Sequence, residues 1–146
     1  MKKVIVLYGS TMGNTEKMTQ IIGDVFKPGG VSITIANVRD KTPADLCEYD
    51  YLLLGSSTWG DGELQDDWVS FEKDMEQVNL AGKSVACFGP GDSMYPQFCK
   101  AVDMLEERAK ACGATVITEG LKIDGEVDAQ AETIREWSEK IVSLCV

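Results

Sequence analysis

The chain of 146 residues contains no histidine, and this absence limits the chemistry that it can perform. Serine–histidine and cysteine–histidine catalysis in their usual forms need an imidazole and are therefore excluded. The cysteines are widely spaced with no C-x-x-C pair, which disfavours a zinc or iron–sulfur site and favours mostly buried free thiols. They are Cys47, Cys87, Cys99, Cys112 and Cys145.

Long apolar runs are also missing. No segment approaches the ~18–20 consecutive apolar residues of a helix that spans a bilayer. The chain passes from Met1-Lys2-Lys3 straight into a short β-like run, without the longer apolar segment and the cleavage site of a secretory signal. We therefore expect a cytoplasmic protein that does not contact membranes.

Positive charge is scarce in the second part of the chain. The net charge is −10, and residues 1–56 carry six basic and six acidic side chains, so the excess lies in residues 57–146. Residues 57–79 hold seven acids against the single Lys73. Nucleic acid is not an expected partner, because its phosphates attract clustered lysine and arginine. The acidic surface could aid solubility or steer a basic protein partner, and charge alone does not decide between them.

Along the chain, strand-like segments alternate with helical patterns. Apolar runs predict five strands, at residues 3–8, 31–36, 51–56, 84–89 and 114–118. Apolar stripes at helical spacing predict four helices, the third ended by Gly113, and residues 41–48 predict at most a short fifth. We assign the tryptophans of these stripes, Trp68 and Trp137, to the core. The stripes are Met18, Ile21, Ile22, Val25 and Phe26; Trp68, Phe71, Met75 and Val78; Phe98, Ala101, Val102, Leu105, Ala109 and Cys112; and Ile134, Trp137, Ile141, Val142 and Cys145.

This alternation predicts a single α/β domain over residues 1–146, with a parallel sheet and helices on both faces. The runs at 4–8, 51–55 and 85–88 are nearly continuously apolar, as central strands are, whereas those at 31–35 and 114–118 alternate, as edge strands do. The pattern favours the strand order 2-1-3-4-5. In that order a ligand binds at the carboxyl ends of strands 1 and 3, where residues 9–14 and 57–63 lie, with residues 89–97 alongside.

The loop between the first strand and the first helix carries hydroxyls and an amide but no charge. It reads Gly9-Ser10-Thr11-Met12-Gly13-Asn14-Thr15. Exposed N–H groups and the positive end of the helix dipole favour a phosphate here. The loop has neither the Gly-Lys-Ser/Thr of a Walker A motif nor the G-x-G-x-x-G of a dinucleotide fold. Neutral donors suit a terminal phosphate monoester; the alternative is that Ser10 and Thr15 are simple turn and cap residues.

Three motifs together resemble one family, the flavodoxins. Residues 6–15 are similar to their FMN-phosphate signature, and Ser57-Thr58-Trp59-Gly60-Asp61 and Gly89-x-Gly91-Asp92-Ser93-x-Tyr95 resemble their two flavin-ring loops. The resemblance covers nearly the whole chain and is nearest to the short-chain flavodoxins of sulfate-reducing, Desulfovibrio-like bacteria. It implies a flavodoxin-like three-layer sandwich around a five-stranded parallel sheet, with FMN as the cofactor.

The resemblance also implies a role for particular residues. Backbone amides of residues 11–15 and the side chains of the loop would hold the phosphate, while Met12 offers only its amide. Trp59 and Tyr95 would flank the ring, and the 92–99 segment would bond its pyrimidine edge through the backbone. The implied FMN contacts are Ser10, Thr11, Met12, Gly13, Asn14, Thr15, Ser57, Thr58, Trp59, Gly60, Asp61, Pro90, Gly91, Asp92, Tyr95, Gln97, Phe98 and Cys99.

The redox behaviour follows from the same loops. By the resemblance, the carbonyl of Gly60 bonds N5–H of the neutral semiquinone, and glycine allows that peptide to reverse. Carboxylates near the ring repel an anionic hydroquinone, so we expect a low potential for the semiquinone/hydroquinone couple. These acids are Asp61, Glu63, Asp66 and Asp67. We expect a monomeric electron carrier and not an enzyme, with partners that present basic patches, such as reductases, hydrogenases or cytochromes.

The main alternative is an FMN-dependent NAD(P)H or quinone oxidoreductase. Such an enzyme needs a substrate pocket and usually a nicotinamide site, for which the chain has almost no sequence left. A response-regulator receiver would need paired acids after the first strand, where Tyr8, Gly9 and Ser10 stand. A low-molecular-weight phosphatase would need a cysteine and an arginine in the first loop, and both are absent.

Overall fold

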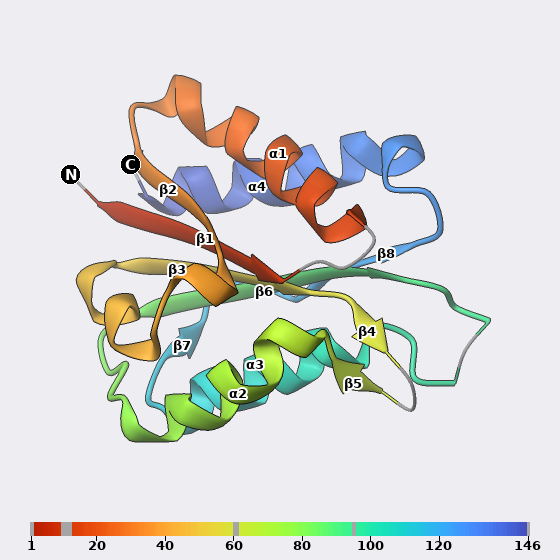
Figure 1. Cartoon of the computed structure of the whole chain (residues 1–146). Coiled ribbons are helices and arrows are strands. Elements are labelled where there is room, and N and C mark those ends of the chain that lie inside the picture. Colours follow the sequence, from red (N-terminus) through yellow and green to blue (C-terminus); the bar gives the residue numbers. More distant parts are fainter. Residues whose placement is uncertain (1, 10–12, 60–61, 95, 146) are drawn as a thin grey trace.

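A parallel sheet lies between two layers of helices in the computed structural model (Figure 1). The structure describes residues 2–9, 13–59, 62–94 and 96–145, with only the backbone of Trp59. Within these residues the sheet has the order β2-β1-β3-β6-β7, and β8 also pairs with β6. Its strands are β1 (Lys3–Gly9), β2 (Ser32–Asn37), β3 (Tyr51–Ser56), β6 (Ser84–Gly91), β7 (Thr115–Val116) and β8 (Leu121–Asp124).

Helices cover both faces of the sheet, as the sequence predicts. α1 and α4 lie on one face and α2 and α3 on the other (Figure 1). The four apolar stripes coincide with these helices, and Gly113 ends the third with a φ of 100°. The stripe residues that lie just outside the helices are Met75, Val78, Phe98 and Cys112. The helices are α1 (Asn14–Phe26), α2 (Asp66–Asp74), α3 (Lys100–Ala111) and α4 (Ala131–Cys145). Short 3₁₀ helices span Lys27–Gly29, Val38–Asp40, Pro43–Glu48, Met75–Gln77 and Asp128–Gln130.

The predicted strand order is confirmed, but the fifth strand is not one continuous run. β7 pairs with the start of β6, and β8 pairs with its end, from Phe88↔Leu121 to Gly91↔Asp124. The chain between them passes close over α3, because a Cβ on Gly120 would lie 2.7 Å from Val102 Cγ1. The predicted strand at 114–118 therefore stops too early. In β8 the buried residues Leu121 and Ile123 alternate with the exposed residues Lys122 and Asp124. This alternation of apolar and charged residues is visible in the sequence.

Two further strands were not predicted. β4 (Thr58–Trp59) and β5 (Glu63–Leu64) form a separate antiparallel pair beyond the end of β3. The sequence pattern predicts a loop at residues 57–63, because a strand of two residues is too short to show the alternation of apolar and polar side chains.

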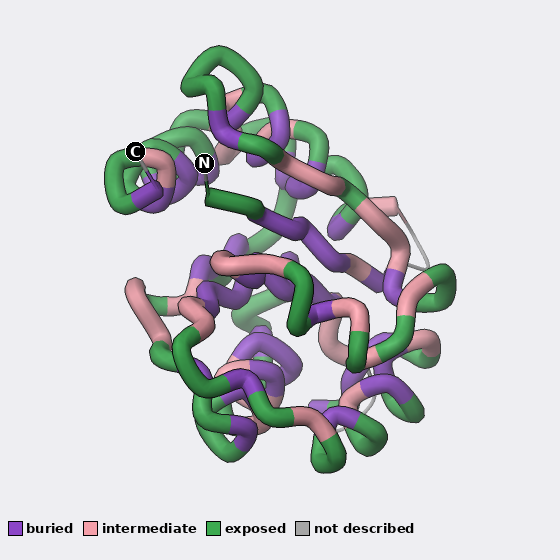
Figure 2. Tube along the Cα trace, turned by 90° about the vertical axis from the view of Figure 1, so that its left-hand side faces the viewer, coloured by how far each residue is buried: buried purple, intermediate pink, exposed green. Residues whose placement is uncertain are grey.

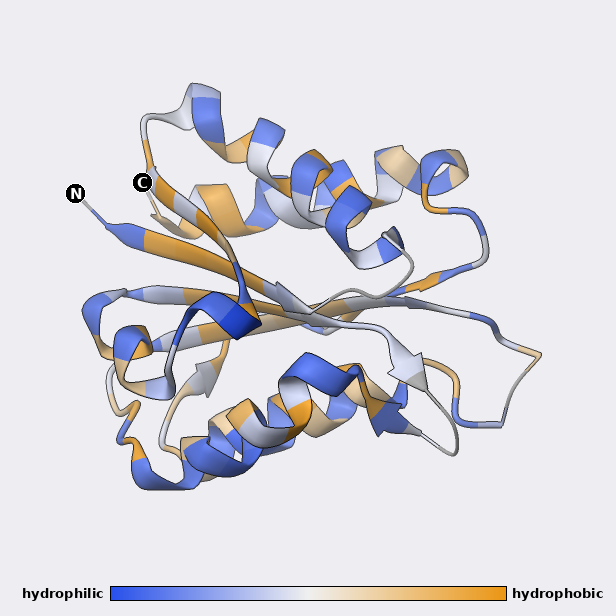
Figure 3. Ribbon diagram, in the orientation of Figure 1, coloured by the Kyte–Doolittle hydropathy of each residue, from blue (hydrophilic) through white to orange (hydrophobic). Residues whose placement is uncertain are grey.

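The core has two parts, one on each face of the sheet. Ile5 and Leu7 point into the part under α2 and α3, whereas Val4 and Val6 point into the part under α1 and α4. The central strands are accordingly buried and apolar (Figures 2 and 3). A continuous apolar run is what a strand buried on both faces requires.

The assignment of Trp68 and Trp137 to the core is confirmed, since they are 0% and 7% exposed. Each indole N–H has a partner: Trp68 Nε1 donates to Gly55 O at 2.7 Å, and Trp137 Nε1 to Glu119 O at 3.0 Å. The hydrogen bond of each indole N–H fixes the orientation of the buried ring.

The cysteines are free, and all are buried except Cys47, which confirms the prediction of mostly buried thiols. Burial raises the pKa of Cys99 to about 12 and the pKa of Cys145 to about 11. None of the helices in the described part of the chain is long and apolar enough to cross a bilayer.

Candidate flavin site

Three loops meet at the carboxyl ends of the central strands. β1 ends at Gly9 and β3 at Ser56, and these two residues are partners in the sheet register. β6 runs beside β3 and ends at Gly91. The chain goes from β1 to β2 on one side, whereas β3 and β6 lie on the other, so the strand order reverses between β1 and β3. This is the switch point at which the sequence predicts a ligand.

Helix α1 begins at this point. Gly13 precedes it with a φ of 86°, and no side-chain cap is found for its N-terminus among the described residues. Asn14 is exposed, while Thr15 is only 1% exposed. A helix N-terminus without a side-chain cap offers backbone N–H groups and a positive potential to an anion. Three predicted phosphate contacts lie outside the residues that the structure describes, namely Ser10, Thr11 and Met12.

Gly9, the first residue of the phosphate loop, is packed under the start of α2. A Cβ on Gly9 would lie 2.4 Å from Gln65 Oε1 and 2.7 Å from Trp68 Cδ1, so only glycine fits without displacing them. Trp68 is in turn tied to the end of β3 by its bond to Gly55. The sequence assigns Trp68 to the core but does not reveal that it supports the base of this loop.

The second loop is a small antiparallel ribbon. β4 and β5 flank residues 60–62, and Gly62 has a φ of 97°. Ser56 Oγ anchors the ribbon, because it donates to Ser57 O at 2.8 Å and accepts from Gln65 N at 3.1 Å. The side chain of Trp59 and the residues Gly60 and Asp61 lie outside the described part, so the predicted ring contact and peptide reversal stay predictions.

The ribbon is joined to the start of α3. Thr58 Oγ1 accepts a bond from Ala101 N at 2.9 Å. A Cβ on Gly62 would lie 3.0 Å from Lys100 Cγ and 3.2 Å from Gln97 Cβ, which shows how closely the turn packs there. The hydroxyl of Thr58, predicted as a cofactor contact, therefore links the two ring loops. Sequence spacing gives no signal for this contact, because it joins residues 43 apart.

The third loop is braced by β8. Asp124 accepts two bonds from Ser93, from its N–H at 2.9 Å and from its hydroxyl at 2.5 Å. These bonds lower the pKa of Asp124. Asp92 accepts from Met94 N at 2.9 Å, which closes a local turn. Asp124 was not predicted as part of the site because β8 was not predicted, and Tyr95 lies outside the described residues.

Cys99 has the only positive φ, 49°, among the described residues other than glycine. It stands directly before α3, is 1% exposed, and its thiol donates to Gly89 O at 3.6 Å. A Cβ on Gly91 would lie 2.8 Å from Cys99 Sγ and 3.2 Å from Phe98 Cδ1, so the glycine makes room for both. Pro90 is buried and Phe98 half-buried beside them. In the described structure no acceptor is found for the backbone N–H of Cys99. A left-handed conformation at a non-glycine residue is costly and points to a functional constraint.

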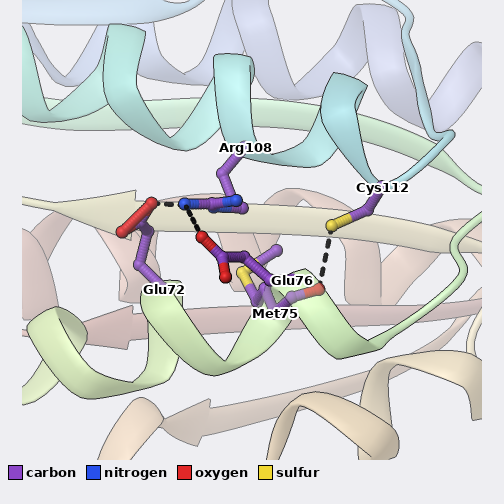
Figure 4. Close-up of polar contacts among 5 residues, drawn as sticks. All are labelled: Glu72, Met75, Glu76, Arg108 and Cys112. Atoms are coloured by element: carbon purple, nitrogen blue, oxygen red, sulfur yellow. Dashed lines mark hydrogen bonds and ion pairs between the residues drawn. The ribbon is translucent and has the colours of Figure 1, made fainter.

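The helices behind these loops are tied together (Figure 4). Arg108 of α3 reaches Glu72 of α2 at 2.8 Å and Glu76 at 3.2 Å, and these acids raise the pKa of the guanidinium. Cys112 donates from Sγ to Met75 O at 3.1 Å. These contacts join α2, which packs over Gly9, to α3, whose start is bonded to Thr58.

The family model for flavodoxin matches residues 6–137. The chain belongs to the flavodoxin family. It is 42% identical over 144 residues to the flavodoxin of Maridesulfovibrio salexigens, covering 97% of both proteins. It is 38% identical over 146 residues to that of Nitratidesulfovibrio vulgaris, covering 98% of this chain and 99% of the relative. The crystal structure of oxidised flavodoxin 1 from Bacillus cereus superposes with a TM-score of 0.90, at 36% identity and 97% coverage of each chain.

These relatives confirm the predicted resemblance to the flavodoxins and the flavodoxin-like fold. Flavodoxins are electron carriers that bind FMN, so this flavodoxin is an electron-transfer protein and not an enzyme. The alternative of an NAD(P)H or quinone oxidoreductase is not favoured. The residues present fit the cofactor, because the α1 N-terminus suits its phosphate and the N–H of Cys99, which has no acceptor among the described residues, suits a carbonyl of its ring.

Charge around this flavodoxin's site is predominantly negative. Glu63 and Asp66 are exposed and Asp67 is half-buried, and all three follow the ribbon or open α2. One basic residue, Lys100 at the start of α3, packs beside Gly62 of the ribbon. An electron added at this edge of the sheet would meet a field that opposes negative charge.

Proposed function

We propose that this flavodoxin carries electrons on one FMN held at the carboxyl ends of β1, β3 and β6. FMN supplies one-electron and two-electron chemistry when it is bound. The chain would supply the residues that bind it, orient it and set its potential. These are Ser10, Thr11, Met12, Gly13, Asn14, Thr15, Ser57, Thr58, Trp59, Gly60, Asp61, Pro90, Gly91, Asp92, Tyr95, Gln97, Phe98 and Cys99.

The proposal depends above all on one observation, that the three loops converge on the switch point of the sheet. Gly9 and Ser56 end paired strands, and the loop after β6 is bonded back to β8 through Ser93. Ligands of open α/β sheets bind in this crevice. The α1 N-terminus would face the phosphate, and the two ring loops would enclose the aromatic end of the cofactor.

The ring end of the site is supported by the conformation of Cys99. Cys99 stands before α3 with a positive φ, and its buried side chain is held beside Gly91 by the bond from its thiol to Gly89 O. A donor fixed in this way costs no further ordering when it binds a carbonyl of the ligand. The thiol itself has no redox role in the proposal, because a pKa of about 12 keeps it protonated.

We further propose that the carrier works at low potential. One carboxylate ~10 Å from the ring, at an effective dielectric constant of ~20, disfavours an added negative charge by roughly 1.7 kcal/mol before salt screening. Glu63, Asp66 and Asp67 would act in this way on the two-electron reduced cofactor. The same acids would attract redox partners with basic patches, such as reductases, hydrogenases or cytochromes. We place the carrier in the cytoplasm, where five free cysteines stay reduced, as a monomer with one domain over residues 1–146.

The phosphate end can be tested by comparing FMN with riboflavin, which lacks the phosphate. Thr15→Val removes a hydroxyl beside the loop, and we expect roughly tenfold weaker FMN binding to the apoprotein, the value of one hydrogen bond to a charged group. Riboflavin affinity should not change. Thr19→Val is the matched control, because Thr19 is equally buried one turn later and its hydroxyl donates to Thr15 O of its own helix at 2.9 Å.

Fluorescence quenching of the flavin measures both affinities. If Thr15→Val binds FMN as tightly as the parent, the phosphate does not contact this hydroxyl. If the parent protein binds no FMN at all, the proposed function is wrong. Visible spectra taken during stepwise reduction of the holoprotein then report the one-electron form and the two potentials.

A further inference from the structure

Met94 has the most exposed large apolar side chain in the described structure. It is 89% exposed, whereas the next, Val69 and Leu144, are 54% and 52% exposed. Single exposed apolar residues are common and need no explanation by themselves. Met94 differs in its place, because it stands in the ring loop between Asp92 and Tyr95.

The backbone that carries Met94 is held in position. Met94 N donates to Asp92 Oδ1, and the residue before it is bonded twice to Asp124 on β8. The strand ends beneath are joined as well, since Gly125 N donates to Gly91 O at 3.0 Å. The loop therefore presents the methionine to solvent from a fixed base. Because the backbone of this loop is already ordered, little further conformational entropy of the backbone is lost when a partner covers the side chain.

The segments that carry and brace this side chain bear exposed carboxylates. They belong to Asp92, Asp124 and Glu126. Lys122, the basic residue of β8, forms an ion pair with Asp103 at 2.9 Å. This surface thus combines an exposed apolar side chain with an acidic rim, formed by Asp92, Asp124 and Glu126. Its complement is a shallow apolar patch with a rim of lysine or arginine.

We propose that Met94 is the apolar anchor through which this flavodoxin docks on redox proteins of that kind. The inference rests on the proposed function, since Met94 borders the ring only if FMN binds between these loops. The acidic rim would steer the encounter, and the methionine would prolong the contact. An unbranched, polarizable side chain suits such a role because it adapts to patches of different shape.

The test uses FMN-loaded protein, reduced under anaerobic conditions with one equivalent of dithionite per FMN so that no reductant is left over, and a small basic ferric c-type cytochrome as the acceptor of one electron. Stopped-flow absorbance at low salt gives the second-order rate constant. We expect Met94→Gln to lower it by about fivefold, as for loss of one apolar interface contact, and Met94→Leu to retain the parent rate. Leu144→Gln is the matched control, because Leu144 lies near the end of α4, at the opposite end of the sheet from the ring loops (Figure 1).

Ferricyanide serves as a second acceptor that needs no apolar docking. A rate loss with the cytochrome alone, at unchanged FMN affinity, supports the anchor. The anchor is overturned if Met94→Gln matches the parent with the cytochrome, if it slows ferricyanide equally, or if Leu144→Gln loses as much. Failure of the parent to bind FMN would show itself first in the flavin spectrum, and would remove the proposed function together with this inference.

Discussion

The close packing over Gly9 makes a sharp prediction for Gly9→Ala. The added methyl group would stand 2.4 Å from Gln65 Oε1 and 2.7 Å from Trp68 Cδ1, and these two side chains are only 3% and 0% exposed. Neither can move into solvent without giving up a bond. Gln65 Oε1 caps α2 by accepting from Asp67 N at 2.9 Å, and Trp68 is bonded to Gly55 O.

The magnitude follows from three terms. Overpacking of a filled site costs about 1–3 kcal/mol, and the upper part of that range applies to contacts this short. Loss of the Trp68–Gly55 bond adds about 1 kcal/mol. Against these, alanine restricts the unfolded chain more than glycine does, which returns roughly 0.5–1 kcal/mol. We expect a net loss of about 2–3 kcal/mol in the free energy of unfolding.

Urea unfolding of the apoprotein, followed by tryptophan fluorescence, measures this loss as a midpoint lower by about 1–2 M. Gly23→Ala is the control. Its methyl would meet only Ile35 Cδ1, at 2.7 Å, and Ile35 is 40% exposed and free to rotate. Because Gly23 lies inside α1, alanine should raise the stability by about 0.5–1 kcal/mol.

FMN affinity should fall for Gly9→Ala and stay unchanged for Gly23→Ala, since only Gly9 leads directly into the phosphate loop. The reasoning would be refuted if Gly9→Ala unfolded at the urea concentration of the parent, or if the two alanines had the same effect. A stable Gly9→Ala protein with normal FMN binding would mean that α2 does not set the position of this loop.

Three more predictions come from the polar groups. Glu106 Oε1 is buried without a described hydrogen-bond partner. Burial, followed by the negative charge of Asp103, raises the pKa of this carboxyl group. Its ionised form therefore lowers the free energy of unfolding increasingly as the pH rises above the ordinary glutamate range. Glu106→Gln should therefore unfold at higher urea than the exposed control Glu107→Gln at neutral pH, and the difference should vanish in acid. Asp124→Asn and Ser93→Ala should each weaken FMN binding, as measured by flavin fluorescence quenching. If both act through the Ser93–Asp124 contact, the double variant should bind FMN no more weakly than the single variant with the lower affinity. Iodoacetamide at mildly alkaline pH should add one group to the folded protein, on Cys47, as read by mass spectrometry; fast labelling of a second cysteine would contradict the buried, raised-pKa thiols.

The sequence predicts the strand order and the place of the site because the signals for them are local. The central strands are apolar throughout, and the run Gly9–Thr15 stands between a strand and a helix whatever the rest of the chain does. The contacts that fix the loops join residues far apart and carry no such signal. Thr58 with Ala101, Ser93 with Asp124 and Gly9 with Trp68 become visible only when the chain is folded.

The interruption between β7 and β8 also shapes how copies of the protein meet. An exposed, unbroken edge strand offers a row of free N–H and C=O groups onto which another molecule can add a strand. At this border only two residues of β7 and four of β8 are extended, and they pair with different halves of β6. A second chain would find no long straight template there. An electron carrier that has to leave one partner for the next gains from a border that discourages lasting self-association.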